Sequence, residues 1–177
     1  MALLPILKYG DPILRKKVHP VTDFTNLDKF IDDMLETMLH EDGIGLAANQ
    51  IGIDMNLLVL DVSHLEDEID TDPRVFINIE IMDTEGEILM EEGCLSVPDI
   101  RAEILRPEKI KIRYQDLSGV HHTEQFSGLL SRILQHEYDH LEGKFFTDYL
   151  PISKKLIIKK RLKEISETGF PSVSVTL

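Results

Sequence analysis

Hydrophobic residues recur every three or four positions in two stretches of the chain, a spacing typical of helices that bury one face. The first stretch spans residues 27–39 and follows Thr25, whose hydroxyl is placed to cap a helix. The second runs over about 127–141, and Gly143 suits its C-terminal end. We expect a third helix over 154–167, where a proline and a serine precede it.

Strand-like patterns occupy the middle of the chain. Residues 57–60 form a short apolar run that suits a buried strand. Residues 75–81 and 109–114 alternate between apolar and polar with period two, as half-buried strands do. The sequence Leu-Ser-Gly at 117–119 predicts a hairpin turn into a strand over 120–126.

These elements do not alternate regularly as βαβ units, so they predict an α+β fold. We expect antiparallel or mixed β-sheets around the central helix, with one helix near the N-terminus and another near the C-terminus. A chain of 177 residues is long enough for one domain, over residues 1–177, and too short for two. The polar, acidic segment 63–73 is expected to be an exposed loop, and about 169–177 a flexible tail.

Composition narrows the class of protein. Hydrophobic residues make up 42% of the chain and charged residues 29%, an ordinary globular mixture. The net charge of −13 argues against DNA binding, because phosphates would be repelled. No stretch approaches the ~20 apolar residues that cross a bilayer, and the apolar start lacks a basic leader, so we expect no membrane anchor and no signal peptide. A single cysteine cannot form an internal disulfide, which favours a cytoplasmic location.

The strongest chemical signal is the sequence His-Glu-Tyr-Asp-His at 136–140, inside the predicted central helix. Residues four apart share a helix face, so His136 and His140 can reach one metal ion. Glu137 lies one step round the helix, where its carboxylate can contact water at that ion. A solvated face with two surface histidines is the alternative, and the inward-facing leucines and isoleucine just before the motif argue against it. We therefore expect a metal-dependent hydrolase.

Two histidines are fewer than the three protein ligands usual at a catalytic metal. A common extension of the motif adds a third histidine, but Phe146 holds that place. Glu164 and Glu167 on the final helix are a second option, weakened by the basic residues around them. Cys94 is the third option, since a thiolate suits zinc or ferrous iron. It lies in a segment flanked by a glycine and a proline, which we expect to have little regular pairing. A lone cysteine is more often inert, yet beside an incomplete histidine pair Cys94 is the favoured ligand.

A third segment, residues 43–52, combines glycines and alanines with Gln50. The small residues allow close approach of the backbone, and Gln50 offers a neutral donor and acceptor. The segment lacks the Gly-Lys-Ser/Thr ending of a phosphate-binding loop. By itself it is as well explained by a tight turn packed under a sheet.

Together the three segments resemble the peptide deformylases, a family with GxGxAAxQ, EGCLS and QHExDHLxG motifs in this order. This chain has GIGLAANQ at 43–50, EGCLS at 92–96 and QHEYDHLEG at 135–143, each without a break. Its GDPILR at 10–15 is also similar to the opening of the family. The resemblance therefore covers nearly the whole chain, and three ordered motifs are far more specific than one.

The resemblance implies hydrolysis of the formyl group from the N-formylmethionine that starts new bacterial polypeptides, an N-terminal processing step of protein biosynthesis. Glu137 would be the general base and acid, and Gln50 and the backbone N–H of Leu95 would stabilise the oxyanion. The implied metal is one divalent ion, Fe(II) in the active form, with zinc, nickel or cobalt as substitutes. Its implied ligands are Cys94, His136 and His140.

Further positions match places that the family uses near its substrate. Arg101 is one of them, and Arg132, at a position that is apolar in some relatives, is expected to make the rim of the pocket more polar. The expected substrate-binding residues are Ile44, Gly45, Arg101, Leu129 and Ile133.

The predicted final helix is basic although the chain is acidic, with Lys or Arg at 154, 155, 159, 160, 161 and 163. A solvated face is one interpretation. Docking to the ribosome, where nascent peptides emerge, is the other, in line with relatives that have such a helix.

Two rival functions stay open at this point. A general HExxH metallopeptidase would need a downstream His or Glu ligand in place of Cys94. A structural metal domain or a peptide-binding module would have no use for Glu137, which is not a ligand.

Overall fold

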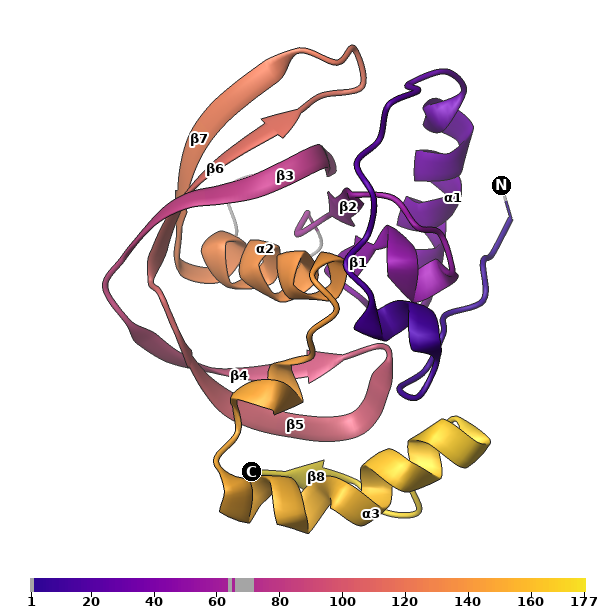
Figure 1. Cartoon of the computed structure of the whole chain (residues 1–177), viewed down its shortest axis with the longest axis vertical. Helices are drawn as coiled ribbons and strands as arrows, with labels where there is room; N and C mark the ends of the chain where they lie inside the picture. The colour runs from indigo at the N-terminus through magenta and orange to yellow at the C-terminus, as the bar shows by residue number, and fades with distance from the viewer. Residues whose placement is uncertain (1, 64, 66–71) are drawn as a thin grey trace.

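The computed structural model describes residues 2–63, 65 and 72–177, and in this part of the chain three α-helices and two β-sheets are arranged with α2 at the centre (Figure 1). The expected loop at 63–73 lies largely outside the described residues. The predicted fold class is confirmed: the fold is α+β, with α1 (Leu27–His40), α2 (Gly128–Leu141) and α3 (Ile152–Thr168). Short 3-10 turns are η1 (Pro12–Arg15), η2 (Ala48–Ile51) and η3 (Phe146–Tyr149).

The larger sheet has five strands, and every neighbouring pair is antiparallel. In spatial order its strands are β1 (Gly45–Ala47), β2 (Leu57–Leu60), β3 (Arg74–Glu85), β6 (Lys109–Gln115) and β7 (His121–Ser127). β2 is apolar throughout because both of its faces are covered. Leu57 and Val59 pack in the core beneath α1, while Leu58 and Leu60 pack in the core beneath α2.

The residue that precedes helix α1 is Asn26, and not the expected cap Thr25. Asn26 has φ of 61° and makes no side-chain capping bond. The hydroxyl of Thr25 donates instead to Asp23 Oδ1 at 2.7 Å, so the predicted capping role of Thr25 is wrong.

The smaller sheet contains β4 (Ile88–Cys94), β5 (Val97–Arg106) and β8 (Val175–Thr176). β4 and β5 are antiparallel and β5 and β8 are parallel, so this sheet is mixed. The expectation of little regular pairing around Cys94 is wrong, because Cys94 ends β4 and pairs with Val97 across a two-residue turn. The pairing register shifts between Glu92 and Cys94, and an irregularity of this kind changes the direction of the side chains at the end of the strand.

Helix α2 lies between the two sheets, as Figure 1 shows. Its Ile133, Leu134 and Leu141 pack against the larger sheet, and polar side chains on its other faces are also buried. Gly143 follows the helix with φ of +75°, and a Cβ there would lie 2.7 Å from the backbone of Arg15. The close approach explains why a glycine ends this helix.

The C-terminal part of the chain covers the smaller sheet from the side opposite α2. Only Ile158 and Ile165 of α3 are buried, and both belong to the core that this sheet forms with η3. After α3 the chain returns and adds β8 beside β5. The expected flexibility of residues 169–177 stays a prediction, although part of this tail is paired with the sheet.

Candidate metal centre and active site

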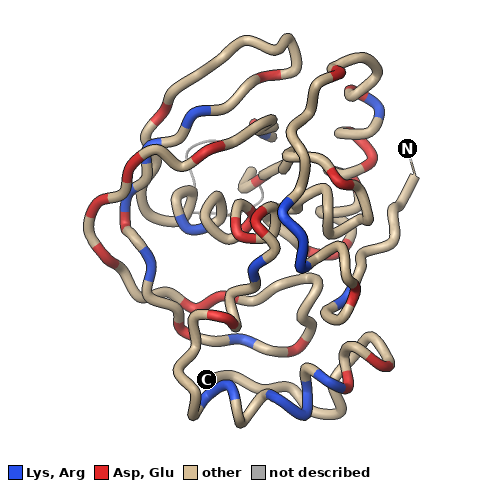
Figure 2. Tube along the Cα trace, viewed as in Figure 1, with Lys and Arg blue, Asp and Glu red and all other residues tan. Residues whose placement is uncertain are grey.

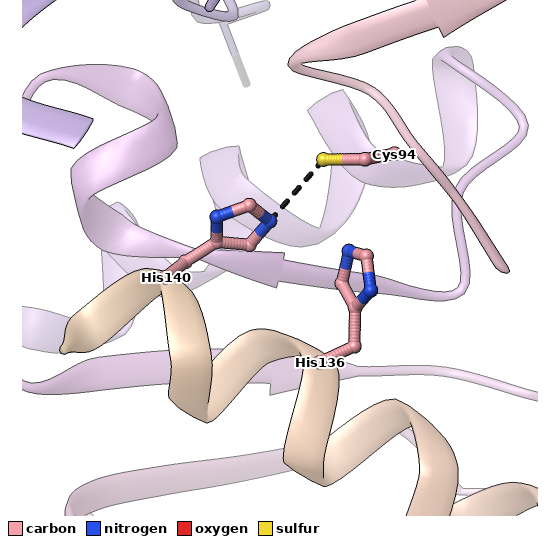
Figure 3. A group of neighbouring side chains, drawn as sticks. All are labelled: Cys94, His136 and His140. Carbon is pink, nitrogen blue, oxygen red and sulfur yellow. Dashed lines mark hydrogen bonds between the residues drawn. The ribbon is translucent and has the colours of Figure 1, made fainter. Parts of the chain in front are cut away.

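Three candidate ligands meet where the end of β4 faces α2 (Figure 3). One ligand atom from each of Cys94, His136 and His140 lies within 4.8 Å of the others. Cys94 Sγ is 3.2 Å from Nε2 of His140. The predicted helical spacing accounts for the histidines, since residues four apart share one face, and the hairpin turn brings in the cysteine.

The charges around these groups fit a cation. Burial alone would lower the pKa of His136, but contacts with Cys94 and Glu92 outweigh it and raise the pKa well above its usual value. Burial and the neighbouring His136 lower the pKa of His140 well below its usual value. A raised pKa means that the surrounding groups hold a proton on His136, a positive charge that a metal ion would replace, while His140 stays neutral. One thiolate and two imidazoles are a donor set that suits zinc or ferrous iron.

A buried ionic network holds His136 in place. Nδ1 of His136 lies 2.8 Å from a carboxylate oxygen of Glu92. Arg106 donates to both Glu92 oxygens at 2.6 and 3.0 Å, and Arg132 donates to one of them at 2.7 Å. Arg106 also donates to Asp139 at 2.6 Å. These partners fix which nitrogen of His136 faces the metal position.

The backbone at the other histidine is tied to the segment 43–52. Nδ2 of Asn49 donates to the carbonyl of His140 at 2.5 Å, and Asn49 is fully buried. This segment is therefore more than a turn under the sheet, because it also positions the end of α2.

Glu137 is buried at the floor of the same site, against the start of β1. A Cβ added to Gly45 would lie 2.7 Å from Glu137 Oε1 and 2.8 Å from Ile133, so only glycine lets the carboxylate approach. Burial raises the pKa of Glu137 to about 7. Its Oε2 has no hydrogen-bond partner within the described part of the chain. A buried carboxylate with one oxygen free of a partner is suited to exchanging protons with a bound molecule.

Gln50 and Leu95 flank Cys94. Oε1 of Gln50 accepts from the N–H of Ala47 at 2.8 Å, which turns the amide NH₂ toward Ser96 Oγ at 3.2 Å and Cys94 Sγ at 3.7 Å. Leu95 is the first residue of the turn that joins β4 to β5. Both predicted oxyanion residues therefore lie beside the candidate metal ligands.

A cleft of about 570 Å³ leads from these groups to the surface. It runs between β1 and β4, each of which is an edge strand of its sheet. All five expected substrate-binding residues line it, namely Ile44, Gly45, Arg101, Leu129 and Ile133. The sequence thus predicted a set of residues that the fold does bring together.

The two arginines of this region differ in their surroundings. Arg101 is half exposed, and its Nε donates to Glu91 at 2.6 Å on the rim of the cleft. Arg132, expected to make the rim more polar, is 4% exposed, and its NH1 and NH2 groups donate to Glu92 and to carbonyl groups of β4 and β5. Arg132 still lines the cleft, so the expectation of a more polar rim stays a prediction, although its guanidinium is bonded to the hairpin.

Several residues of the site were not identified from the sequence. Glu92 and Asp139 stand inside the recognised motifs as charged residues on the buried side of their elements, which was the available signal. Nothing in the local sequence indicated that Arg106 belongs to the site, since its partners are distant in sequence. Lys8 and Phe170, from opposite ends of the chain, also line the cleft.

Comparisons with known proteins agree with this geometry. The sequence model described as polypeptide deformylase matches residues 3–156. The peptide deformylase of Zymomonas mobilis is 50% identical over 93% of this chain and 96% of its own length, and that of Chlorobium luteolum is 43% identical over 96% and 90%. The crystal structure of the peptide deformylase from Thermus thermophilus has a TM-score of 0.87 and 37% identity, covering 94% of this chain and 99% of the other.

No α-helix within the described residues has the length and apolar character to cross a membrane. Family-wide similarity extends over almost the whole chain, from the N-terminal arm to α3, and includes every motif that forms the site. The chain belongs to the polypeptide deformylase family.

Proposed function

We propose that this protein removes the formyl group from the N-formylmethionine of newly made polypeptides and releases formate. The observation that carries the proposal is the buried Glu137, whose Oε2 has no partner within the described residues, next to Cys94, His136 and His140. These groups lie at the inner end of a cleft bounded by two edge strands. A general HExxH peptidase is less favoured, because the third candidate ligand is Cys94 and not a downstream His or Glu.

Cys94, His136 and His140 would hold one divalent ion. When bound there, such an ion supplies Lewis-acid chemistry, making water more acidic and polarising a carbonyl oxygen. The chain supplies the geometry: Glu92 orients His136, and Asn49 holds the backbone of His140.

Glu137 moves the proton in the proposed reaction. Its Oε2 takes the proton of the water that attacks the formyl carbon and returns it to the departing amine nitrogen. A pKa near neutrality suits a group that must both accept and donate a proton in one cycle. Breaking the C–N bond then leaves formate and a free N-terminal methionine.

Gln50 and the backbone N–H of Leu95 are proposed to stabilise the formyl oxygen as it becomes negative. The support is the fixed direction of the Gln50 amide, whose oxygen is occupied by Ala47 and whose NH₂ group faces Cys94. Removing one such donor typically costs about 10²–10³ in rate.

The substrate backbone is proposed to lie as an added strand between β1 and β4. Within the described residues, β1 and β4 are each the outermost strand of their sheet and both border the cleft, and an extended peptide can join a sheet at such an edge. The methionine side chain would enter the apolar part of the cleft, lined by Ile44, Leu129 and Ile133. Arg101, at the rim, would contact later residues of the peptide.

The test is formate release from a formyl-Met-Ala-Ser peptide, compared among wild type, Glu137→Gln and Cys94→Ala. We expect both variants to lose at least about 10³ in kcat/KM, with Glu137→Gln retaining its metal and Cys94→Ala losing it. Activity and metal binding that survive in Cys94→Ala would favour the peptidase. Unchanged properties in Glu137→Gln, including its metal content, would favour a binding module without catalysis.

We propose Fe(II) as the ion of the active enzyme, with zinc, nickel or cobalt able to replace it. The support is the mixed thiolate and imidazole donor set, which both ferrous iron and zinc accept. Purification without oxygen followed by metal analysis tests it, and activity that is lost in air and preserved by nickel substitution is expected for iron.

We further propose that the basic face of α3 docks to the ribosome, and hence that the protein acts in the cytoplasm. Figure 2 shows blue segments recurring along α3 although the chain is acidic. Lys155, Lys159 and Lys160 are exposed there. These charges would attract the phosphates of ribosomal RNA.

Charge reversal is a sharper test of docking than deletion of the helix, since α3 also supplies Ile158 and Ile165 to the core. Lys155→Glu with Lys159→Glu should weaken sedimentation with ribosomes while formate release from short peptides persists. Lys109→Glu with Lys111→Glu, on β6, changes the net charge equally and serves as control. Equal weakening in both pairs would contradict docking through α3.

A further inference from the structure

The segment after α3 crosses the outer end of the cleft. The N–H of Gly169 donates to the carbonyl of Ile165 at 2.8 Å, and the positive φ of Gly169, +85°, turns the chain back. The next residue, Phe170, lines the cleft together with Lys8. The two ends of the chain therefore meet at the place where a peptide would leave the site.

Hydrogen bonds on both sides of Phe170 anchor the backbone that carries its ring. The hydroxyl of Thr168 donates to the carbonyl of Phe170 at 2.9 Å. The N–H of Ser172 donates to the carboxylate of Glu164 at 2.8 Å, and its hydroxyl donates to the same group. Further on, β8 is paired with β5, the strand that carries Arg101. The ring is thus displayed from an anchored turn.

Phe170 is 60% exposed, although a phenyl group gains stability when it leaves water. Nζ of Lys8 lies 5.8 Å from the ring centroid and donates to the carbonyl of Leu95 at 2.8 Å. Lys8 therefore links the ring to the turn beside Cys94. Single exposed apolar residues are common, but this one faces a cleft that receives a peptide.

The direction of the substrate decides which of its residues this ring can meet. The formyl group must reach Glu137, which is buried, and the methionine side chain has an apolar pocket near Ile133. The exposed end of the cleft is left for the residues that follow methionine. Apolar and aromatic side chains would bury area against the Phe170 ring there, whereas small ones would not.

We propose that Phe170, steadied by Lys8, is a specificity-determining residue that favours large apolar or aromatic side chains at the second or third residue of formyl-methionyl peptides. The proposal rests on deformylation as the reaction. The proposal adds to the lining of the cleft a substrate contact from the C-terminal segment, which lies outside the three motifs.

The test compares kcat/KM for formyl-Met-Ala-Ser with formyl-Met-Phe-Ser and formyl-Met-Ala-Phe. In the wild type the phenylalanine peptide should be preferred at one of the two positions. Phe170→Ala should reduce that preference about three- to tenfold, in the range that hydrophobic contacts of a few methylene groups give, and Phe170→Leu should restore most of it. Val173→Ala is the matched control, because Val173 is 57% exposed on the same segment and does not line the cleft.

An unchanged preference in Phe170→Ala would overturn the proposal, even if activity fell in equal proportion on all three peptides, since that result would indicate a structural role alone. If the wild type released no formate from any peptide, the proposed function would fail and the specificity proposal with it. A preference altered equally by Val173→Ala would likewise count against Phe170.

Discussion

The carboxylate of Glu92 lies 2.8 Å from Nδ1 of His136, with both groups buried between β4 and α2. Burial alone would raise the pKa of Glu92, but hydrogen bonds from His136 and Arg106 outweigh it and lower the pKa far below its usual value. The carboxylate is therefore ionised and accepts from the N–H of Nδ1, which leaves Nε2 of His136 as the nitrogen that a metal ion would bind in place of its proton.

Glu92→Gln tests this relationship. The amide removes the charge that orients His136, leaves Arg132 without its buried counter-ion and leaves Arg106 with Asp139 alone. Metal affinity should therefore fall about 10–100-fold and the free energy of unfolding by about 3–5 kcal/mol. Chelator competition and urea unfolding measure the two effects. Glu91→Gln, one residue away on the exposed face, is the control and should keep its metal affinity. Equal affinities in both variants would contradict the role of Glu92.

Gly45→Ala tests the close approach of β1 to Glu137. The added methyl group would meet Glu137 Oε1 at 2.7 Å and Ile133 at 2.8 Å, so the carboxylate must shift. A displacement of about 1 Å at a reacting group costs on the order of 10² in rate, and metal content should stay the same because no ligand is touched. Gly119→Ala is the control: no atom of the described residues lies within 4 Å of the added methyl group, and the φ of +76° puts the strain in a turn that does not line the cleft, so this variant should keep its kcat even where it loses stability. Full activity in Gly45→Ala would contradict the claim that catalysis depends on the close approach of β1 to Glu137.

Stability should depend on acid pH through Glu124 on β7. Burial alone would raise the pKa of Glu124, but hydrogen bonds from Tyr114 at 2.5 Å and Arg74 at 2.8 Å outweigh it and lower the pKa below its usual value. A lowered pKa gives stability that is present above the unfolded value, near 4.3, and is lost as pH falls through the folded value. Glu124→Gln should cost about 1 kcal/mol at pH 7, since the group is partly exposed.

The measurement is the free energy of unfolding of wild type and Glu124→Gln between pH 7 and pH 3. The gap between the two proteins should close below about pH 4. A gap that stays constant over this range would contradict the ionised, hydrogen-bonded state of Glu124.

Removal of the metal should destabilise the fold. A ligand that binds only the native state stabilises it by about 3–4 kcal/mol at 100–1,000 times its Kd, which corresponds to about 5–15 °C in Tm for a chain of this size. Treatment with a chelator should lower Tm by that amount, and added Fe(II), nickel or zinc should restore it. Cys94→Ala should show the low Tm with or without metal. A chelator-treated wild type with unchanged Tm would argue against a site at Cys94, His136 and His140.

The helices and most strands of the larger sheet could be predicted because their hydrophobic period is regular. The period of β5 is disguised, since Leu105 is exposed while Arg106, beside it, is buried in the network with Glu92. On β4, Leu89 is likewise exposed and Glu92 buried. A strand that buries charged residues and exposes leucines cannot be recognised from its apolar pattern. The buried charges here belong to the network that contacts His136, one of the candidate metal ligands.

Cys94, His136 and Glu137 could be identified from motifs, since their chemistry depends on residue type and spacing. Lys8 and Phe170 could not, because nothing in their local sequence indicates that the chain ends meet at the cleft. Thr25 shows the reverse case: its local sequence suits a cap, but the nearby Asp23 accepts its hydroxyl hydrogen bond.

The most direct test of the account is metal analysis of protein purified without oxygen, paired with formate release from formyl-Met-Ala-Ser by the same sample. The account predicts one divalent ion per chain, iron in the active preparation, and formate release that rises in proportion to bound metal. Full metal occupancy without formate release, or formate release from protein without metal, would contradict it.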